Sequence, residues 1–333
     1  MAIFVWGISA LELWRSRFDA LAPSRALPQA SARPGSAAAA IASLVAGSVA
    51  RPVHVEVASA ALRPQVAGVV AHVRGQPLPR GAYYRLGGSP ASDDVTVYVA
   101  GPEALFVQLA AELPFLELVA LAAELCAGYV LRPGDDRGFS WRHPVTTRRS
   151  LERFVARCEG ARGVRAARRA LPLVAEGALS PPEAKTALLA ALSTRRGGYG
   201  CGMPLINCSP DGQSRVSELV EAADSGRGVG SYVCDLLWPE RGVALEYQGR
   251  EAHGTERLVR DAVRQVRLGA AGIDVVPLTH EQLNDALLFH EVMMALMRKS
   301  GTPWRCTVPD FAERRRVLRR ALRCLSTGAY HLR

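Results

Sequence analysis

Hydrophobic and polar positions follow two periods in the first half of the chain, and each period indicates a kind of secondary structure. Apolar residues recur at helical spacing in three segments, at residues 8–18, 101–131 and 150–175. Alternating β-branched residues predict four strands, at residues 51–59, 67–79, 83–88 and 95–101. Pro114 should divide the second helical segment in two. We therefore expect a small sheet accompanied by helices, with the acidic residues of that divided segment facing water: Glu103, Glu112, Glu117 and Glu124.

The second half opens with a strong helix-start signal. Ser180 can cap a helix whose first turn contains Pro181, Pro182 and Glu183. The patterns that follow predict, in order, a short strand at the end of residues 195–209, strands at 231–239 and 242–249, a helix at 257–272, a strand at 273–279, and helices at 280–298 and 310–323. Residues 212–228 show no clear period, and we expect a loop there. This order is typical of an α/β domain with a mixed sheet.

These elements suggest four regions along the chain. Residues 1–50 would hold N-terminal helices and an Ala, Ser and Pro-rich linker, 51–175 an α+β domain, 176–300 an α/β domain, and 301–333 a basic C-terminal helix. No stretch reaches the roughly 18 to 20 uninterrupted apolar residues that a membrane helix needs. Seven cysteines without a Cys-x-x-Cys pair, and the lack of a basic leader, predict a cytoplasmic protein with reduced thiols and no membrane association.

Charge adds an expectation about partners. The chain has 41 Lys and Arg against 31 Asp and Glu, a formal net charge of +10, which favours polyanions. Residues 142–169 contain nine arginines against Glu152 and Glu159, and another basic run covers residues 313–323. We predict phosphate contacts from the arginines at the end of the first cluster, Arg165, Arg168 and Arg169, although a solvated helix face would have the same composition.

Candidate chemistry comes from two acids in apolar strands. Asp235 and Glu246 lie on either side of the predicted turn at residues 239–241, each within an apolar run where a lone carboxylate would be costly to bury. Paired strands would place them on one face, where they could hold a divalent cation such as Mg²⁺ or Mn²⁺. A structural pair neutralised by arginines is the alternative.

Other candidates surround this pair. Gln248 follows Glu246 by two residues, so strand alternation places it on the same face, where its amide could position water without supplying charge. Glu183 is a candidate fourth member, and His253 a candidate proton donor or ligand. Arg250 and Arg260 could contact phosphate.

The run from Tyr232 to Leu283 resembles the very-short-patch-repair-like endonuclease domain of the PD-(D/E)XK superfamily. The matching positions, which include the acid pair, are Asp235, Trp238, Pro239, Glu246, Gly249, His253, Arg260, Asp261, Gly272 and Thr279. The resemblance implies a restriction-endonuclease-like mixed sheet flanked by helices in residues 176–300, with Mg²⁺ or Mn²⁺ as cofactor and DNA as substrate. One departure is Gln248, because the family usually has Asp there and the wider superfamily often has Lys.

Residues 68–131 resemble, more loosely, abortive-infection type IV antitoxin-like proteins, on the segments GVVAHVRGQPLP and VYVAGPEALFVQLAAEL. Such proteins often precede nuclease domains of this kind. Together the features predict a metal-dependent DNA endonuclease acting at Asp235, Glu246 and Gln248. The alternatives are a catalytically weak or inactive nuclease-fold regulator that binds DNA, and a module that binds a partner protein of a defence system. A homodimer is also left open.

Overall fold

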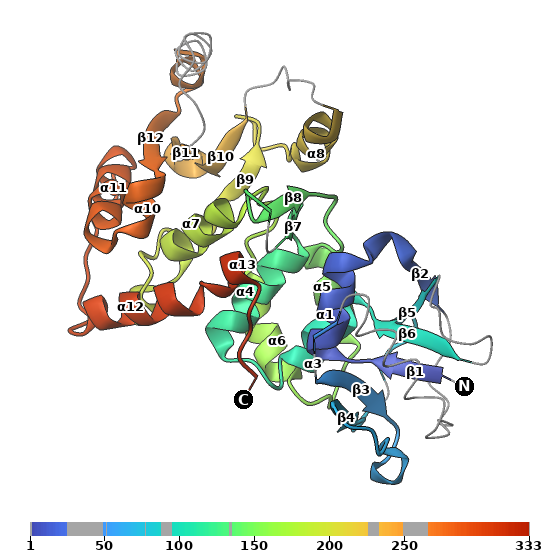
Figure 1. Cartoon of the computed structure of the whole chain (residues 1–333). Helices are drawn as coiled ribbons and strands as arrows, with labels where there is room; N and C mark the ends of the chain where they lie inside the picture. The colour runs from blue at the N-terminus through green and yellow to red at the C-terminus, as the bar shows by residue number, and fades with distance from the viewer. Residues whose placement is uncertain are drawn as a thin grey trace. The chain divides into compact units, whose positions relative to one another are not determined.

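The computed structural model describes residues 2–24, 49–50, 52–76, 78–87, 95–132, 135–225, 233–248 and 266–332 (Figure 1). They form a mixed α/β protein of two compact units. The first unit comprises Met1–Leu118, Thr146–Pro172 and Tyr330–Arg333, and the second comprises Val119–Val145 and Leu173–Ala329. The linker predicted at residues 26–50 falls almost wholly outside the described residues.

The first unit contains a six-stranded sheet in the order β2-β5-β6-β1-β3-β4 (Figure 1). The strands are β1 (Ala2–Val5), β2 (Leu21–Ser24), β3 (Val53–Val57), β4 (Val69–Val73), β5 (Tyr83–Leu86) and β6 (Thr96–Ala100). The four strands expected from alternating patterns are all present. β1 and β2 join them, and β1 pairs in parallel with β6 and antiparallel with β3 at the centre of the sheet. Its apolar sequence suits that position, where both faces are covered.

Helices pack beside this sheet, and two of the four acids expected to face water are buried. The helices are α1 (Gly7–Ser16), α3 (Pro102–Leu109), α5 (Arg148–Ala156) and α6 (Val164–Ala170), with the first turn of α4 (Phe115–Leu125). Pro114 separates α3 from α4 as predicted. Glu117 and Glu124 are only 7% and 1% exposed, which corrects that expectation. Burial of Glu117 is compensated because it accepts the main-chain N–H of His331 at 2.7 Å.

The second unit contains a two-stranded hairpin and several helices. The hairpin joins β7 (Tyr129–Leu131) to β8 (Phe139–Trp141), and the main helices are α7 (Pro181–Ala191), α8 (Val216–Ser225), α10 (His280–Asn284), α11 (Ala286–Lys299), α12 (Phe311–Ala321) and α13 (Cys324–Thr327). Ser180 caps α7 as its sequence predicts. The prediction of a loop at residues 212–228 was wrong, because α8 occupies much of that segment. Val216 and Val220 of α8 pack on Leu179, and such tertiary burial of an apolar face stabilises a short helix.

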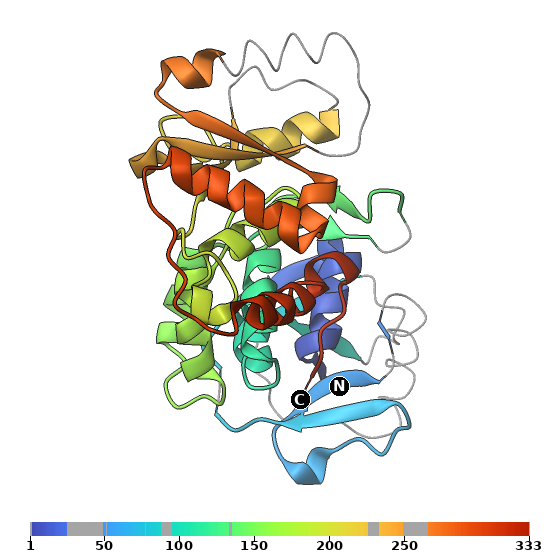
Figure 2. The ribbon, with the colours of Figure 1, turned by 90° about the vertical axis from the view of Figure 1, so that its left-hand side faces the viewer.

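The second unit also holds a four-stranded mixed sheet in the order β12-β11-β10-β9. Its strands are β9 (Leu205–Cys208), β10 (Cys234–Trp238), β11 (Val243–Gln248) and β12 (Asp274–Thr279). β9, β10 and β11 pair antiparallel, whereas β12 runs parallel to β11. A parallel neighbour requires a crossover connection, and residues 266–270 before β12 are helical. α11 lies along one face of the sheet and contacts β11 and β12 (Figure 2).

Candidate active site

Asp235 and Glu246 face each other across two neighbouring strands of the second unit. The pairing of Leu236 with Leu245 continues to put Asp235 directly opposite Glu246, so both side chains leave the same face of the sheet. The main-chain N–H of Asp235 donates to Glu246 Oε1 at 3.3 Å, and the N–H of Tyr247 donates to Asp235 Oδ2 at 2.8 Å. Each carboxylate is therefore bonded to the main chain of the neighbouring strand.

Two further polar side chains extend this row. Asn207 on β9 lies opposite Asp235, because the pairs Cys208–Cys234 and Ile206–Leu236 flank that position. Its amide donates to Glu183 Oε2 at 2.6 Å and to the carbonyl of Gly177 at 3.0 Å. Asn207 also has a φ of 48°, an uncommon left-handed conformation that Asn tolerates better than most residues.

Glu183, at the start of α7, is held by several donors. Its carboxylate accepts the main-chain N–H of Leu179 at 2.9 Å and the Ser180 hydroxyl at 2.7 Å, besides Asn207. Burial first, and then the negative charge of Asp235, raise the pKa of Glu183 from 4.5 to about 7 against the lowering effect of these hydrogen bonds. Glu183 and Asp235 therefore influence each other's charge, as members of one site would.

The remaining residues expected at this site differ in what the structure describes. Gln248 ends β11, is exposed, and lies on the same face as Glu246 by strand alternation. It pairs with Thr279, the last residue of β12 and the N-cap of α10. His253, Arg250 and Arg260 lie outside the described residues.

The arginines predicted to contact phosphate belong to the other unit. Arg165, Arg168 and Arg169 are exposed on α6 of the first unit. The guanidinium of Arg169 lies over the ring of Phe115 at 5.2 Å from its centroid. They are not part of the row formed by the carboxylates, which lies wholly in the second unit.

Sequence reasoning missed Asn207 and a chain of side chains behind β11. Tyr247, between Glu246 and Gln248, shares a hydrogen bond of 3.0 Å between its hydroxyl and His280 Nδ1. His280 Nε2 in turn accepts from the amide of Asn284 at 2.9 Å. A polar Asn inside the apolar run of β9 is the same signal that singled out Asp235, and it could have identified Asn207.

The acid pair suits a hard divalent cation. Within the part of the chain that is described, no cluster of three or more His, Cys, Asp or Glu side chains is arranged to hold a metal. Mg²⁺, however, is commonly held by one or two carboxylates together with waters and substrate phosphates. A carboxylate has about four lone-pair positions, and the main-chain N–H that Asp235 and Glu246 each accept uses one of them. The donor set therefore fits Mg²⁺ or Mn²⁺.

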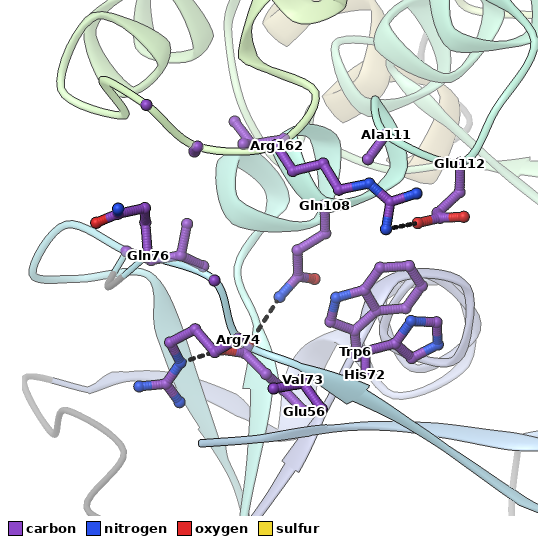
Figure 3. Close-up of a pocket in the computed structure, with 15 residues that line it drawn as sticks. Trp6, Glu56, His72, Val73, Arg74, Gln76, Gln108, Ala111, Glu112 and Arg162 are labelled. Atoms are coloured by element: carbon purple, nitrogen blue, oxygen red, sulfur yellow. Dashed lines mark hydrogen bonds and ion pairs between the residues drawn. The ribbon is translucent and has the colours of Figure 1, made fainter. Parts of the chain in front are cut away.

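The first unit contains a separate pocket (Figure 3). It has a volume of about 410 Å³, and Trp6 stacks on His72 at its wall with ring centroids 3.6 Å apart. Glu56 accepts hydrogen bonds there from the Tyr83 hydroxyl at 2.7 Å and from Gln108 Nε2 at 2.9 Å, and it forms an ion pair with Arg74. The buried charge is compensated within the protein, so we interpret this network as structural.

Comparisons with known protein families, with curated proteins and with solved structures found no match for this chain. None of the helices in the described segments is long and apolar enough to cross a membrane.

Proposed function

We propose that the second unit is a metal-dependent DNA endonuclease that hydrolyses phosphodiester bonds at Asp235, Glu246 and Gln248. The observation that carries the proposal is the position of Asp235 opposite Glu246, one step beyond the Leu236–Leu245 pair, where each carboxylate accepts a main-chain N–H of the other strand. The surrounding order, a helix carrying Glu183 followed by three antiparallel strands and a parallel fourth, supports the restriction-endonuclease-like arrangement that the PD-(D/E)XK resemblance implies.

Each residue has a distinct role in this proposal. Asp235 and Glu246 would hold Mg²⁺ or Mn²⁺, which when bound lowers the pKa of water and neutralises charge on the scissile phosphate. Gln248 orients the attacking water through its amide. Glu183 and Asn207 hold the polar row in place beside Asp235, through the bond between their side chains.

A second function is favoured by one feature of the same site. Gln248 supplies no charge where related nucleases usually have Asp or Lys, and a loss of charge weakens transition-state stabilisation. The alternative is therefore a nuclease-fold regulator, similar to antitoxins, that binds DNA without cutting it.

Cleavage of plasmid DNA tests the first function against the second. Wild-type protein with Mg²⁺ or Mn²⁺ should convert supercoiled plasmid to nicked or linear forms, and Asp235→Asn should abolish this. Glu240→Gln is the matched control, since Glu240 is an exposed acid in the turn between β10 and β11. Undiminished cleavage by Asp235→Asn would contradict the assignment, and salt-dependent DNA binding without cleavage by wild type would select the regulator.

Metal binding separates a working site from a relic independently of turnover. Calorimetric titration with Mn²⁺ should detect binding to wild type and lose it in Glu246→Ala. Equal heats from the two proteins would show that the metal binds elsewhere.

A further inference from the structure

The second unit also contains a strongly basic pocket, which is lined by none of Asp235, Glu246, Gln248, Glu183 and Asn207. It has a volume of about 490 Å³ and is lined by residues of α7, α12 and the segment around the start of α11. Six of its nine lining residues are basic and none is acidic: Lys185, Arg315, Arg316, Arg319, Arg320 and Arg323 are the basic ones. We call this the basic pocket.

Two of the cations are held in place by neutral groups. Arg319 donates from Nη1 to the carbonyl of Leu283 at 2.8 Å, and its guanidinium lies 5.1 Å from the centroid of the Phe289 ring. Lys185 donates to Asn284 Oδ1 at 3.0 Å. These contacts order the side chains without neutralising them, so the positive charges are pre-positioned for an anion.

The charge of the basic pocket is largely uncompensated. Arg316 forms an ion pair with Glu313, but among the described residues the other five basic side chains form none. Asp285, which feels the charges of Arg319 and Arg315, uses its carboxylate to cap α11 by accepting the N–H groups of Leu287 and Leu288. Burial first, and then the charges of Arg319 and Arg323, lower the pKa of Lys185 to about 8. A bound anion would relieve this repulsion.

The extent of the pocket favours a chain of phosphates over a single ion. Four of its arginines, from position 315 to 320, lie on one face of α12, where five residues of helix rise about 7.5 Å, and Arg323 follows in the turn after the helix. Phosphates along one strand of duplex DNA are about 3.4 Å apart in rise, so about three fit this length.

The basic pocket is also connected by side chains to the strand that carries Glu246. Asn284, which accepts from Lys185, donates to His280, and His280 bonds the hydroxyl of Tyr247 on β11. Lys185 itself lies two residues after Glu183 on α7. The pocket and the carboxylate row thus share both a helix and a hydrogen-bonded chain within one unit.

We propose that the basic pocket binds the sugar-phosphate backbone of duplex DNA. The choice of DNA as the polyanion rests on the proposed function, whereas the anion specificity rests on the pocket alone. Arg320 and Arg323, which are exposed, contact the DNA phosphates directly in this proposal. Arg319 and Lys185, whose side chains are held by neutral groups, supply positive charge at fixed positions in the pocket.

Fluorescence anisotropy with a labelled DNA duplex in a metal chelator tests this binding apart from cleavage. The double variant Arg320→Ala with Arg323→Ala should weaken affinity about tenfold and reduce the slope of log affinity against log salt by about 2. The matched control is Arg298→Ala with Arg305→Ala, which removes two exposed arginines of the same unit outside the pocket. It should change affinity by less than about threefold. Circular dichroism verifies that both variants are folded.

Several results would overturn the proposal. Equal losses in the two double variants would show that only net charge matters, and an unchanged affinity in the pocket variant would show that DNA binds elsewhere. Wild type that binds tripolyphosphate but no duplex would assign the pocket to a small phosphate ligand. Failure of cleavage by wild type, with pocket-dependent DNA binding intact, would overturn the nuclease proposal alone.

Discussion

Replacing Glu183 with Gln should make the protein's stability less dependent on pH. The wild-type carboxyl has a pKa of about 7 in the folded protein, against an ordinary value of 4.5. Below pH 4.5 the group is protonated in both states and costs nothing. As the pH rises from 4.5 to 7, the unfolded chain loses this proton first, so the folded state becomes progressively less stable. Above pH 7 the cost is complete.

The size of the effect follows from the shift in pKa. A shift of about 2.5 corresponds to at most about 3 kcal/mol. Because Gln imitates the neutral carboxyl and can keep part of the hydrogen bonding to Leu179 and Ser180, Glu183→Gln should avoid most of this cost. We expect the variant to gain about 1–3 kcal/mol relative to wild type between about pH 5 and about pH 8.

Urea unfolding, followed by circular dichroism at about pH 5 and about pH 8, measures the difference in the free energy of unfolding between the variant and wild type. Glu152→Gln is the control, since the Glu152 side chain is 43% exposed on α5, and its effect should stay below about 0.5 kcal/mol at both pH values. Parallel loss of stability with pH in wild type and Glu183→Gln would refute the reasoning. So would a variant that is less stable than wild type at the higher pH, because the charged form would then be the stabilised one.

Three other substitutions test contacts inside each of the two units. Glu56→Ala should lower the free energy of unfolding by about 3–5 kcal/mol, since it leaves the guanidinium of Arg74 largely buried without its carboxylate; urea unfolding should show this, and a loss below about 1 kcal/mol would contradict it. Gly197→Ala should cost about 1–3 kcal/mol, because Gly197 has a φ of 87° and an added Cβ would lie 2.3 Å from the carbonyl oxygen of Arg314; an unchanged Tm would refute the clash. Burial lowers the pKa of His72 from 6.5 to about 4, so its contribution to stability is full above pH 6.5 and lost as the pH falls toward 4; His72→Gln should remove this acid sensitivity of at most about 3 kcal/mol in urea titrations across that range, and an unchanged pH dependence would argue against it.

Local sequence patterns determine much of the secondary structure and the central part of the candidate site. Short apolar runs with β-branched and aromatic residues predict β10 and β11, and the tight turn between them sets the register that places Asp235 opposite Glu246. The capping signal at Ser180 likewise defines the start of α7 from four consecutive residues. These features depend on interactions between residues a few positions apart, so they can be predicted from the sequence alone.

Tertiary structure decides the features that join distant segments. The register of β9 places Asn207 beside Asp235, and packing of α7 places Glu183 within reach of Asn207. Packing of α8 on Leu179 makes a helix of a segment whose pattern predicts a loop. The basic pocket combines Lys185 with arginines more than a hundred residues later in the chain. Hydrophobic burial is non-directional, so periodicity shows that a face will be covered, but only the folded chain determines which segment covers it.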